Sequence, residues 1–275
     1  FEGGNPDLAP EVADTMTFGI VFTPEGLPGF TATVDYYDIQ IEDAIAQEAY
    51  GVIMNLCIDE GNQAYCDLIH RDQFGSLWNT NQGFVETTYQ NIGLFANSGV
   101  DVSLAYMHTL GSAGLISADI AGTYFLENIT EQAGVAYDCV GYFGLGSCGD
   151  PQPEWKHRLR VSWETNFGST FSLGWRYTGK VWNETSASDQ DALYDPEQQE
   201  LYEVSQIGWV DAYNWLDLAW THNFTDNIQF TLGINNVLDK DPPLGADHAD
   251  DPNWTFYSAY DPLGRYTHAS LRFTF

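Results

Sequence analysis

The chain ends in Ala269-Ser270-Leu271-Arg272-Phe273-Thr274-Phe275, where apolar and polar side chains strictly alternate. Successive side chains of a strand point to opposite faces, so this pattern predicts a strand with one apolar and one polar face. In water the edge of such a strand would invite pairing with other chains. A membrane barrel closes the edge and turns the apolar face to lipid, while a soluble edge strand is the alternative.

The same alternation recurs along the chain and predicts nine strands, at 13–23, 30–41, 86–110, 115–127, 155–167, 170–182, 208–223, 228–238 and after residue 262. Most reach the roughly 9–11 residues that a tilted strand needs to cross a bilayer. Short connections alternate with long irregular ones at 43–85, 128–154, 183–207 and 239–262. Short periplasmic turns and long extracellular loops are typical of a porin-like barrel. We therefore expect an all-β, antiparallel transmembrane β-barrel.

Charged residues in the middle of the predicted strands mark the face that meets water. They are Asp35, Asp101, Asp119, Arg158, Arg160, Glu164, Arg176, Asp217 and Arg272. Charges are costly in lipid, so we expect this face to line a wet lumen. An odd number of strands cannot close a purely antiparallel barrel. Residues 1–275 are therefore expected to be the C-terminal portion of a larger barrel.

The composition excludes some classes of protein. With 39 acidic and 9 basic residues the net charge is -30, which argues against a general nucleic-acid binder. Aromatic residues make up 15% of the chain, and large amphipathic aromatics favour membrane interfaces and binding sites. No HExxH or Gly-x-Ser-x-Gly motif is present, so we do not expect an enzyme, an outer-membrane hydrolase being a minor alternative.

The four cysteines fall in two pairs, Cys57/Cys66 and Cys139/Cys148, each with eight residues between them. A zinc site prefers shorter Cys spacing or nearby histidines. The spacing favours two local disulfides over zinc, and disulfides indicate an oxidising compartment.

Five sequence stretches, taken together, resemble the TonB-dependent outer-membrane receptors. They are Gly4-Asn5-Pro6-Asp7-Leu8-Ala9-Pro10-Glu11, Val34–Ile39, Asn91–Gly93 with Ser98–Asp101, Gly233–Asp239, and Gly264-Arg265 leading to Phe275. The resemblance implies a barrel of about 22 strands plugged by an N-terminal domain, of which this chain would hold the last nine strands. The plug and the energy-coupling box are not in this sequence. Leu271, Phe273 and Phe275 resemble the assembly signal of such barrels.

The resemblance also implies a location and partners. The protein would lie in the outer membrane of a Gram-negative bacterium, with long loops extracellular and the C-terminus periplasmic. Its partners would be membrane lipid and lipopolysaccharide, a TonB-type energy-coupling complex, a transported small molecule and, as a candidate, a surface lipoprotein. The ligand would be a ferric siderophore, a cobalamin-like cofactor or an oligosaccharide. Loop aromatics with few basic residues slightly favour a neutral glycan. A passive porin and a non-transporting surface protein are the alternatives.

Candidate ligand-binding residues are loop aromatics and one strand arginine: Trp78, Tyr142, Phe143, Trp254, Tyr257 and Arg176. Aromatic rings can stack on sugars or on an aromatic siderophore, although loop packing explains them equally well. Four strand arginines could bind an anionic ligand inside the barrel, or could instead pair with lumen carboxylates such as Glu164 and Asp217 or contact the plug. They are Arg158, Arg160, Arg176 and Arg272.

Three further aromatics, Trp182, Trp209 and Tyr213, lie near strand ends and are interpreted as part of an interfacial girdle. The acidic group Asp247, His248, Asp250 and Asp251 lacks the spacing of a defined calcium loop. It is interpreted as a solvated loop, and no metal or cofactor is predicted.

Deleting Phe275 from the full receptor should impair assembly while leaving synthesis intact. An aromatic would leave the lipid-facing register, losing on the order of 1.5–3 kcal/mol of apolar burial. Trp or Tyr at this position should rescue partly, and Asp should not. Heat-modifiable gel migration and membrane fractionation measure assembly. Wild-type assembly of the Asp variant would contradict the barrel-terminus interpretation.

Overall fold

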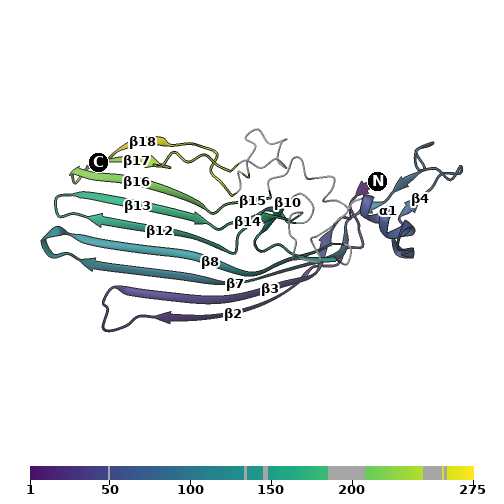
Figure 1. Ribbon diagram of the computed structural model, residues 1–275, viewed down its shortest axis with the longest axis horizontal. Helices are drawn as coiled ribbons and strands as arrows, with labels where there is room; N and C mark the ends of the chain where they lie inside the picture. The colour runs from purple at the N-terminus through teal and green to yellow at the C-terminus, as the bar shows by residue number, and fades with distance from the viewer. Residues whose placement is uncertain (49, 133–134, 145–147, 185–207, 244–255, 257–258) are drawn as a thin grey trace. The chain divides into compact units, whose positions relative to one another are not determined.

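The computed structural model describes residues 1–275 apart from 49, 133–134, 145–147, 185–207, 244–255 and 257–258 (Figure 1). The chain packs into two compact units. The first comprises Phe1–Thr15, Ile39–Ala96 and Ile129–Tyr137, and the second Met16–Asp38, Asn97–Asn128 and Asp138–Phe275.

One large sheet contains nine long strands, which lie side by side in the order of the chain (Figure 1). They are β2 (Val12–Phe22), β3 (Phe30–Ala46), β7 (Gln90–Thr109), β8 (Leu115–Gln132), β12 (Trp155–Glu164), β13 (Ser169–Thr178), β16 (Tyr213–Thr225), β17 (Ile228–Asn235) and β18 (Tyr266–Phe273). A short strand, β9 (Val135–Asp138), pairs with β8. The sheet confirms the predicted all-β class and all nine predicted strands.

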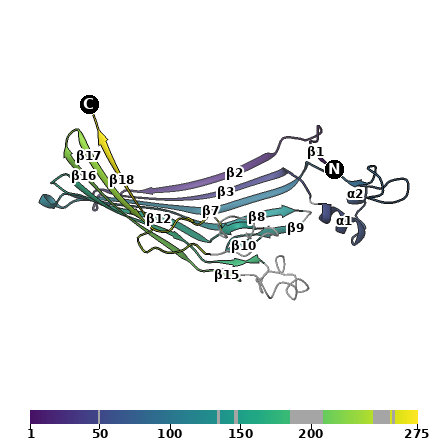
Figure 2. The ribbon, with the colours of Figure 1, turned by 90° about the horizontal axis from the view of Figure 1, so that it is seen from above.

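The connections differ sharply in length at the two ends of the strands. In the second unit, the tight turns at 23–29, 110–114, 165–168 and 226–227 lie at one end, on the left of Figure 1. Gly114 closes one of these turns with a φ of 106°, and a Cβ there would collide with the Glu164 carbonyl oxygen. Seen from above, β16, β17 and β18 cross β12 at an angle, as strongly twisted strands do (Figure 2).

The register of β12 and β13 sorts their side chains onto two chemically different faces. Leu159, Val161 and Trp163 pair with Trp175, Leu173 and Phe171, whereas Arg158, Ser162 and Glu164 pair with Arg176, Ser172 and Thr170. The apolar face continues across β16 and β17 through Leu218, Trp220, Leu232 and Ile234. Its large rings are exposed in this chain: Trp163 is 39% exposed and Phe171 is 42% exposed. An apolar surface this continuous fits contact with lipid.

The terminal strand follows the predicted register. In β18, Leu271 and Phe273 lie opposite Phe230 and Ile228 of β17, so both belong to the apolar face. The backbone N–H of Thr274 donates to Asn227 at 3.0 Å, and Phe275 follows with a fully exposed ring. Within the described part of the chain, β18 and β2 are the two edges of the sheet.

The first unit contains two helices in the stretch 43–85, which was predicted to be irregular; that prediction was wrong. α1 spans Tyr50–Ile58 and α2 spans Gln63–Cys66. The Asn62 side chain accepts the Ala64 N–H at 3.1 Å and caps α2. The Cys57–Cys66 disulfide joins the two helices, with the Cα atoms 4.7 Å apart. Helices this short leave only a weak periodic signal in a sequence.

Short strands complete the two units. In the first, β1 (Glu2–Gly3) pairs with β6 (Thr87–Thr88), and β4 (Ile69–His70) pairs with β5 (Phe84–Val85). In the second, a small sheet has the order β11 (Gly149–Gln152), β10 (Tyr142–Gly144), β14 (Val181–Asn183) and β15 (Trp209–Val210). The predicted Cys139–Cys148 disulfide is present beside it, with a Cα separation of 5.2 Å.

The N-terminal motif has a clear structural role within the first unit. The Asn5 amide donates to the Tyr89 carbonyl oxygen at 3.0 Å. The Asn91 amide donates to Ala9 O at 2.9 Å and accepts from Ala9 N–H at 2.9 Å. These bonds fasten the Gly4–Glu11 segment to the start of β7, which explains why Asn occupies both positions.

Among the helices that the structure describes, none is long and apolar enough to cross a bilayer.

The two faces of β13 can be tested with neighbouring residues. Leu173→Arg places a charge on the apolar face and should destabilise the assembled receptor by about 2–4 kcal/mol if that face meets lipid near the bilayer midplane. Ser172→Arg, on the polar face, is the matched control and should lose only about 1 kcal/mol, for the hydrogen bond between the Ser172 and Ser162 hydroxyls. Urea unfolding of the receptor in lipid measures both. Equal destabilisation by the two variants would contradict the assignment of the faces.

Candidate functional site

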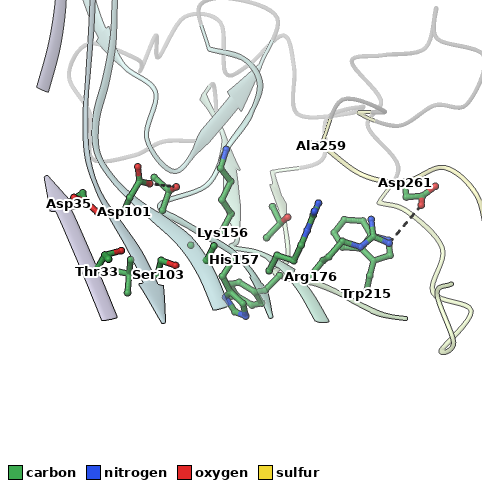
Figure 3. Close-up of a pocket in the computed structure, with 17 residues that line it drawn as sticks. Thr33, Asp35, Asp101, Ser103, Lys156, His157, Arg176, Trp215, Ala259 and Asp261 are labelled. Carbon is green, nitrogen blue, oxygen red and sulfur yellow. Dashed lines mark hydrogen bonds and ion pairs between the residues drawn. The ribbon is translucent and has the colours of Figure 1, made fainter. Parts of the chain in front are cut away.

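The polar face of the second unit carries a cavity of about 450 Å³ between β3 and β16. Figure 3 shows Asp35 and Asp101 on one side of it and Arg176, Trp215 and Asp261 on the other. Its lining includes the polar side chains of Thr33, Asp35, Asp101, Ser103, Thr123, Lys156, Arg158, Arg176, Thr178 and Asp261, together with the rings of His157, Tyr177 and Trp215.

Strand register brings the basic residues of this cavity together. Lys156 lies opposite Thr123 of β8 and Thr178 of β13. One level further along the strands, Arg158 lies opposite Ala121 and Arg176, and Arg176 lies opposite Trp215 of β16. Residues that are directly paired in adjacent strands share a face. Three cations from two neighbouring strands therefore point to the same face.

Carboxylates come to the cavity from the other direction. Asp35 is supplied by β3 and Asp101 by β7. Asp101 accepts the Thr123 hydroxyl at 2.6 Å. In the second unit, the segments 16–38 and 97–128 contain no Lys or Arg. The cavity therefore has an acidic side and a basic side.

Arg176 is held by acidic and aromatic neighbours. Its Nε lies 3.2 Å from Asp217 Oδ2 and its Nη2 lies 3.9 Å from Asp261 Oδ2. The Nε contact is close without the alignment of a hydrogen bond, so it acts as an ion pair. The guanidinium also lies 5.1 Å from the Trp215 ring, within cation–π range. The expected pairing with Asp217 is confirmed, and the ligand role of Arg176 stays a prediction.

Other donors at the basic side have no acceptor among the described residues. Arg158 takes part in no hydrogen bond or ion pair with the described residues, and Lys156 Nζ lies 4.7 Å from the Phe125 ring. The Trp215 indole Nε1 is buried and has no partner within the described segments. A buried N–H without an acceptor is unfavourable by about 1–3 kcal/mol, which an incoming acceptor would relieve.

An aromatic cluster packs beside the cavity. Its members are Phe143, Val181, Val210, Tyr213, Trp215, Phe256 and Tyr260. Phe143 is only 1% exposed and lies 5.1 Å from the Phe256 ring, so it packs in the interior of the unit. Burial raises the pKa of the Tyr260 phenol, whose hydroxyl lacks a partner within the described segments. The cluster fixes Trp215 in place.

Tyr213 belongs to this cluster, so its interpretation as a girdle residue was wrong. Its side chain is 3% exposed, and its hydroxyl donates to Lys240 O at 2.7 Å and to Asp241 O at 2.6 Å. The reason is register: Tyr213 lies opposite Thr178 on the polar face, where a loop covers it. By contrast, Trp182 and Trp209 remain exposed with centroids 5.8 Å apart, and Lys180 Nζ lies 3.8 Å from the Trp182 ring. Their girdle role stays a prediction.

Trp78 projects from a braced loop in the first unit and is 82% exposed. The Asp72 carboxylate accepts the N–H groups of Phe74 and Ser76, each at 2.9 Å, and the Thr80 hydroxyl at 3.2 Å. Burial alone would raise the pKa of Asp72, but these hydrogen bonds outweigh it and lower the pKa below 3.8. The Trp78 indole is therefore exposed to solvent on a loop that the hydrogen bonds of Asp72 stabilise.

Of the remaining predicted residues, the structure describes only Tyr142. Tyr142 is half-buried in β10, while Trp254, Tyr257 and the acidic group Asp247, His248, Asp250 and Asp251 lie outside the described residues. No group of three metal-binding side chains occurs in the part of the chain that the structure describes. The sequence placed Asp35, Asp101 and Arg158 on the wet face but did not gather them into one cavity, and it missed Lys156.

The twisted sheet, with one apolar and one polar face, is the wall of a β-barrel of the outer-membrane class. The family described as TonB dependent receptor-like, beta-barrel matches residues 1–237. The chain therefore belongs to this family, which implies the Gram-negative outer membrane. No curated protein sequence matches it significantly.

Solved structures show the same fold. The ferric enterobactin receptor PfeA of Pseudomonas aeruginosa, as the R480A mutant in complex with enterobactin, aligns with a TM-score of 0.64 at 14% identity, over 100% of this chain and 33% of that one. The siderophore receptor PirA of Acinetobacter baumannii aligns with a TM-score of 0.62 at 16% identity, over 100% of this chain and 33% of that one. The ferric-catecholate import receptor Fiu of K12 E. coli aligns with a TM-score of 0.52 at 15% identity, over 97% of this chain and 28% of that one. The chain spans about a third of the length of these receptors.

The packing role of Phe143 can be tested. Phe143→Ala should destabilise the second unit by about 3–5 kcal/mol, because it removes a fully buried ring. Tyr260→Phe is the matched control: it keeps the ring, removes a hydroxyl that has no partner among the described residues, and should be neutral or stabilising. Limited proteolysis and thermal melts of the assembled receptor measure both. A harmless Phe143→Ala would show that the ring is not packed as described.

Proposed function

We propose that the receptor containing this chain imports a scarce small molecule across the outer membrane, driven by a TonB-type complex. The observation that carries the proposal is the family match over residues 1–237, on a sheet whose register gives it an apolar and a polar face. The chain would be the C-terminal portion of a barrel of about 22 strands around an N-terminal plug.

We favour a ferric siderophore over a neutral glycan as the ligand class. The names of the similar structures, which include receptors for ferric enterobactin and ferric catecholates, support this choice. The charged side chains around the cavity, which are of both signs, favour a charged ligand over a neutral glycan. The sequence alone slightly favoured a glycan, on the small number of basic residues in the whole chain.

The loop aromatics remain candidates for first contact with the ligand. Trp78 and Tyr142 would offer ring faces, as would Trp254 and Tyr257. Phe143 would act through packing rather than by direct contact, since its ring is buried. Lipopolysaccharide would surround the barrel, the loops would face outward, and a surface lipoprotein is a candidate accessory partner.

Uptake of radioactive ferric siderophore by cells that express the full receptor should be saturable and should fall at least about tenfold when the TonB-type complex is disrupted. The reason is that a plugged barrel releases its ligand inward only when energy is supplied. Cells with an intact complex but no receptor give the background. Uptake that is linear in ligand concentration and indifferent to TonB would contradict the proposal and favour a passive porin.

A further inference from the structure

Apart from Asp261, which pairs with Arg176, the charges that line the cavity are separated by strand. The acidic side comes from β3 and β7 through Asp35 and Asp101, and the basic side comes from β12 and β13 through Lys156, Arg158 and Arg176. β8 lies between the two sides and contributes Ala121, Gly122 and Thr123 to the cavity lining, none of which is charged. The cavity is therefore a dipole with a neutral middle.

In the described residues the two sides form no ion pair with each other. Asp101 is level with Thr123, to which it is hydrogen-bonded, and Thr123 is level with Lys156. Neighbouring strands are roughly 4.8 Å apart, which puts about 10 Å between the Asp101 and Lys156 backbones and about 14 Å between β7 and β13. Accordingly, within the described residues no ion pair joins either carboxylate to Lys156, Arg158 or Arg176.

The basic side also has a donor that lacks an acceptor. Trp215 is 3% exposed, lines the cavity, and its Nε1 has no partner in the described part of the chain. Asp217 and Asp261 partly neutralise Arg176, whereas Arg158 has no such counter-charge among these residues. An anionic group in the cavity would supply a counter-charge to Arg158, and the Trp215 indole N–H is a further donor beside Arg176.

We propose that this cavity binds a ligand with charges of both signs, its ammonium group against Asp35 and Asp101 and its anionic group against Arg158, Arg176 and the Trp215 indole. The inference rests on the proposed uptake function, because a wall cavity matters when ligand enters the barrel. A ligand placed the other way round would bring like charges together. A purely anionic chelate would use half the site, and a neutral glycan would leave both charged sides without partners.

A tripeptide is a suitable probe, since three extended residues span roughly 10 Å. Triglycine carries both charges, N-acetyl-triglycine only the anion, and triglycinamide only the cation. In calorimetry with the purified full receptor, triglycine should bind about tenfold tighter than either analogue, a difference of about 1.4 kcal/mol. Equal binding of the three peptides would overturn the proposal, and so would the absence of triglycine binding at millimolar concentration.

The variants should separate the two sides. Asp35→Asn combined with Asp101→Asn should weaken triglycine and triglycinamide about tenfold and leave N-acetyl-triglycine unchanged. Arg158→Gln should weaken triglycine and N-acetyl-triglycine about tenfold and leave triglycinamide unchanged. If Arg158→Gln impairs folding, Arg158→Lys is the milder variant to measure. Loss of all three peptides in either variant, with normal heat-modifiable migration, would overturn the assignment.

Two controls remove the same charges outside the cavity. Asp119 and Arg272 lie on the polar face but do not line the cavity, so triglycine affinity should stay within about twofold of wild type in Asp119→Asn and in Arg272→Gln.

Uptake measurements distinguish this inference from the proposed function. If TonB-dependent uptake persists while triglycine does not bind, this inference falls alone. If charge-selective binding holds while uptake ignores TonB, the proposed function falls alone.

Discussion

Backbone pairing between neighbouring strands is the interaction on which the rest of this structure depends. Once Val161 is paired with Leu173, every other residue of β12 and β13 is assigned to a face, because side chains alternate along a strand. A slip of β12 by one residue would move Arg158 to the apolar face and Trp163 to the polar one. The cost of charge in lipid and of exposed rings in water makes that slip unfavourable, so the sequence pattern and the hydrogen-bond ladder specify the same register.

The cavity is a consequence of that register. The charged residues of the cavity come from distant parts of the sequence, and strand pairing brings them to one face. One row of paired residues across β8, β12 and β13 is Thr123, Lys156 and Thr178. The next row on the same face is Ala121, Arg158 and Arg176. The aromatic cluster around Phe143 and Tyr260 then holds Trp215 beside Arg176. Polar function and apolar packing thus share one strand, β16, which supplies Trp215 and Asp217 from two successive positions of the same face.

The long strands were predictable from the sequence, since a period of two over about ten residues is a strong signal. The faces, both disulfides and the family were predictable for similar local reasons. The pairing of Arg176 with Asp217 was one of two alternatives. The short helices at Tyr50–Ile58 and Gln63–Cys66 were missed because they span too few turns to show a period. Tyr213 was misplaced because its burial depends on Lys240 and Asp241, distant in sequence. The cavity was missed because cross-strand register is a tertiary property.

The central claim is that one face of this sheet meets lipid and the other meets water. Spin labels placed one at a time from Phe171 to Thr178 of β13, in the full receptor in lipid, test it most directly. Accessibility to oxygen dissolved in lipid and to a water-soluble nickel chelate should alternate with a period of two and in opposite phase, with Phe171, Leu173, Trp175 and Tyr177 on the lipid side. Accessibility that shows no alternation along β13, or that alternates with Ser172 and Arg176 in lipid, would contradict it.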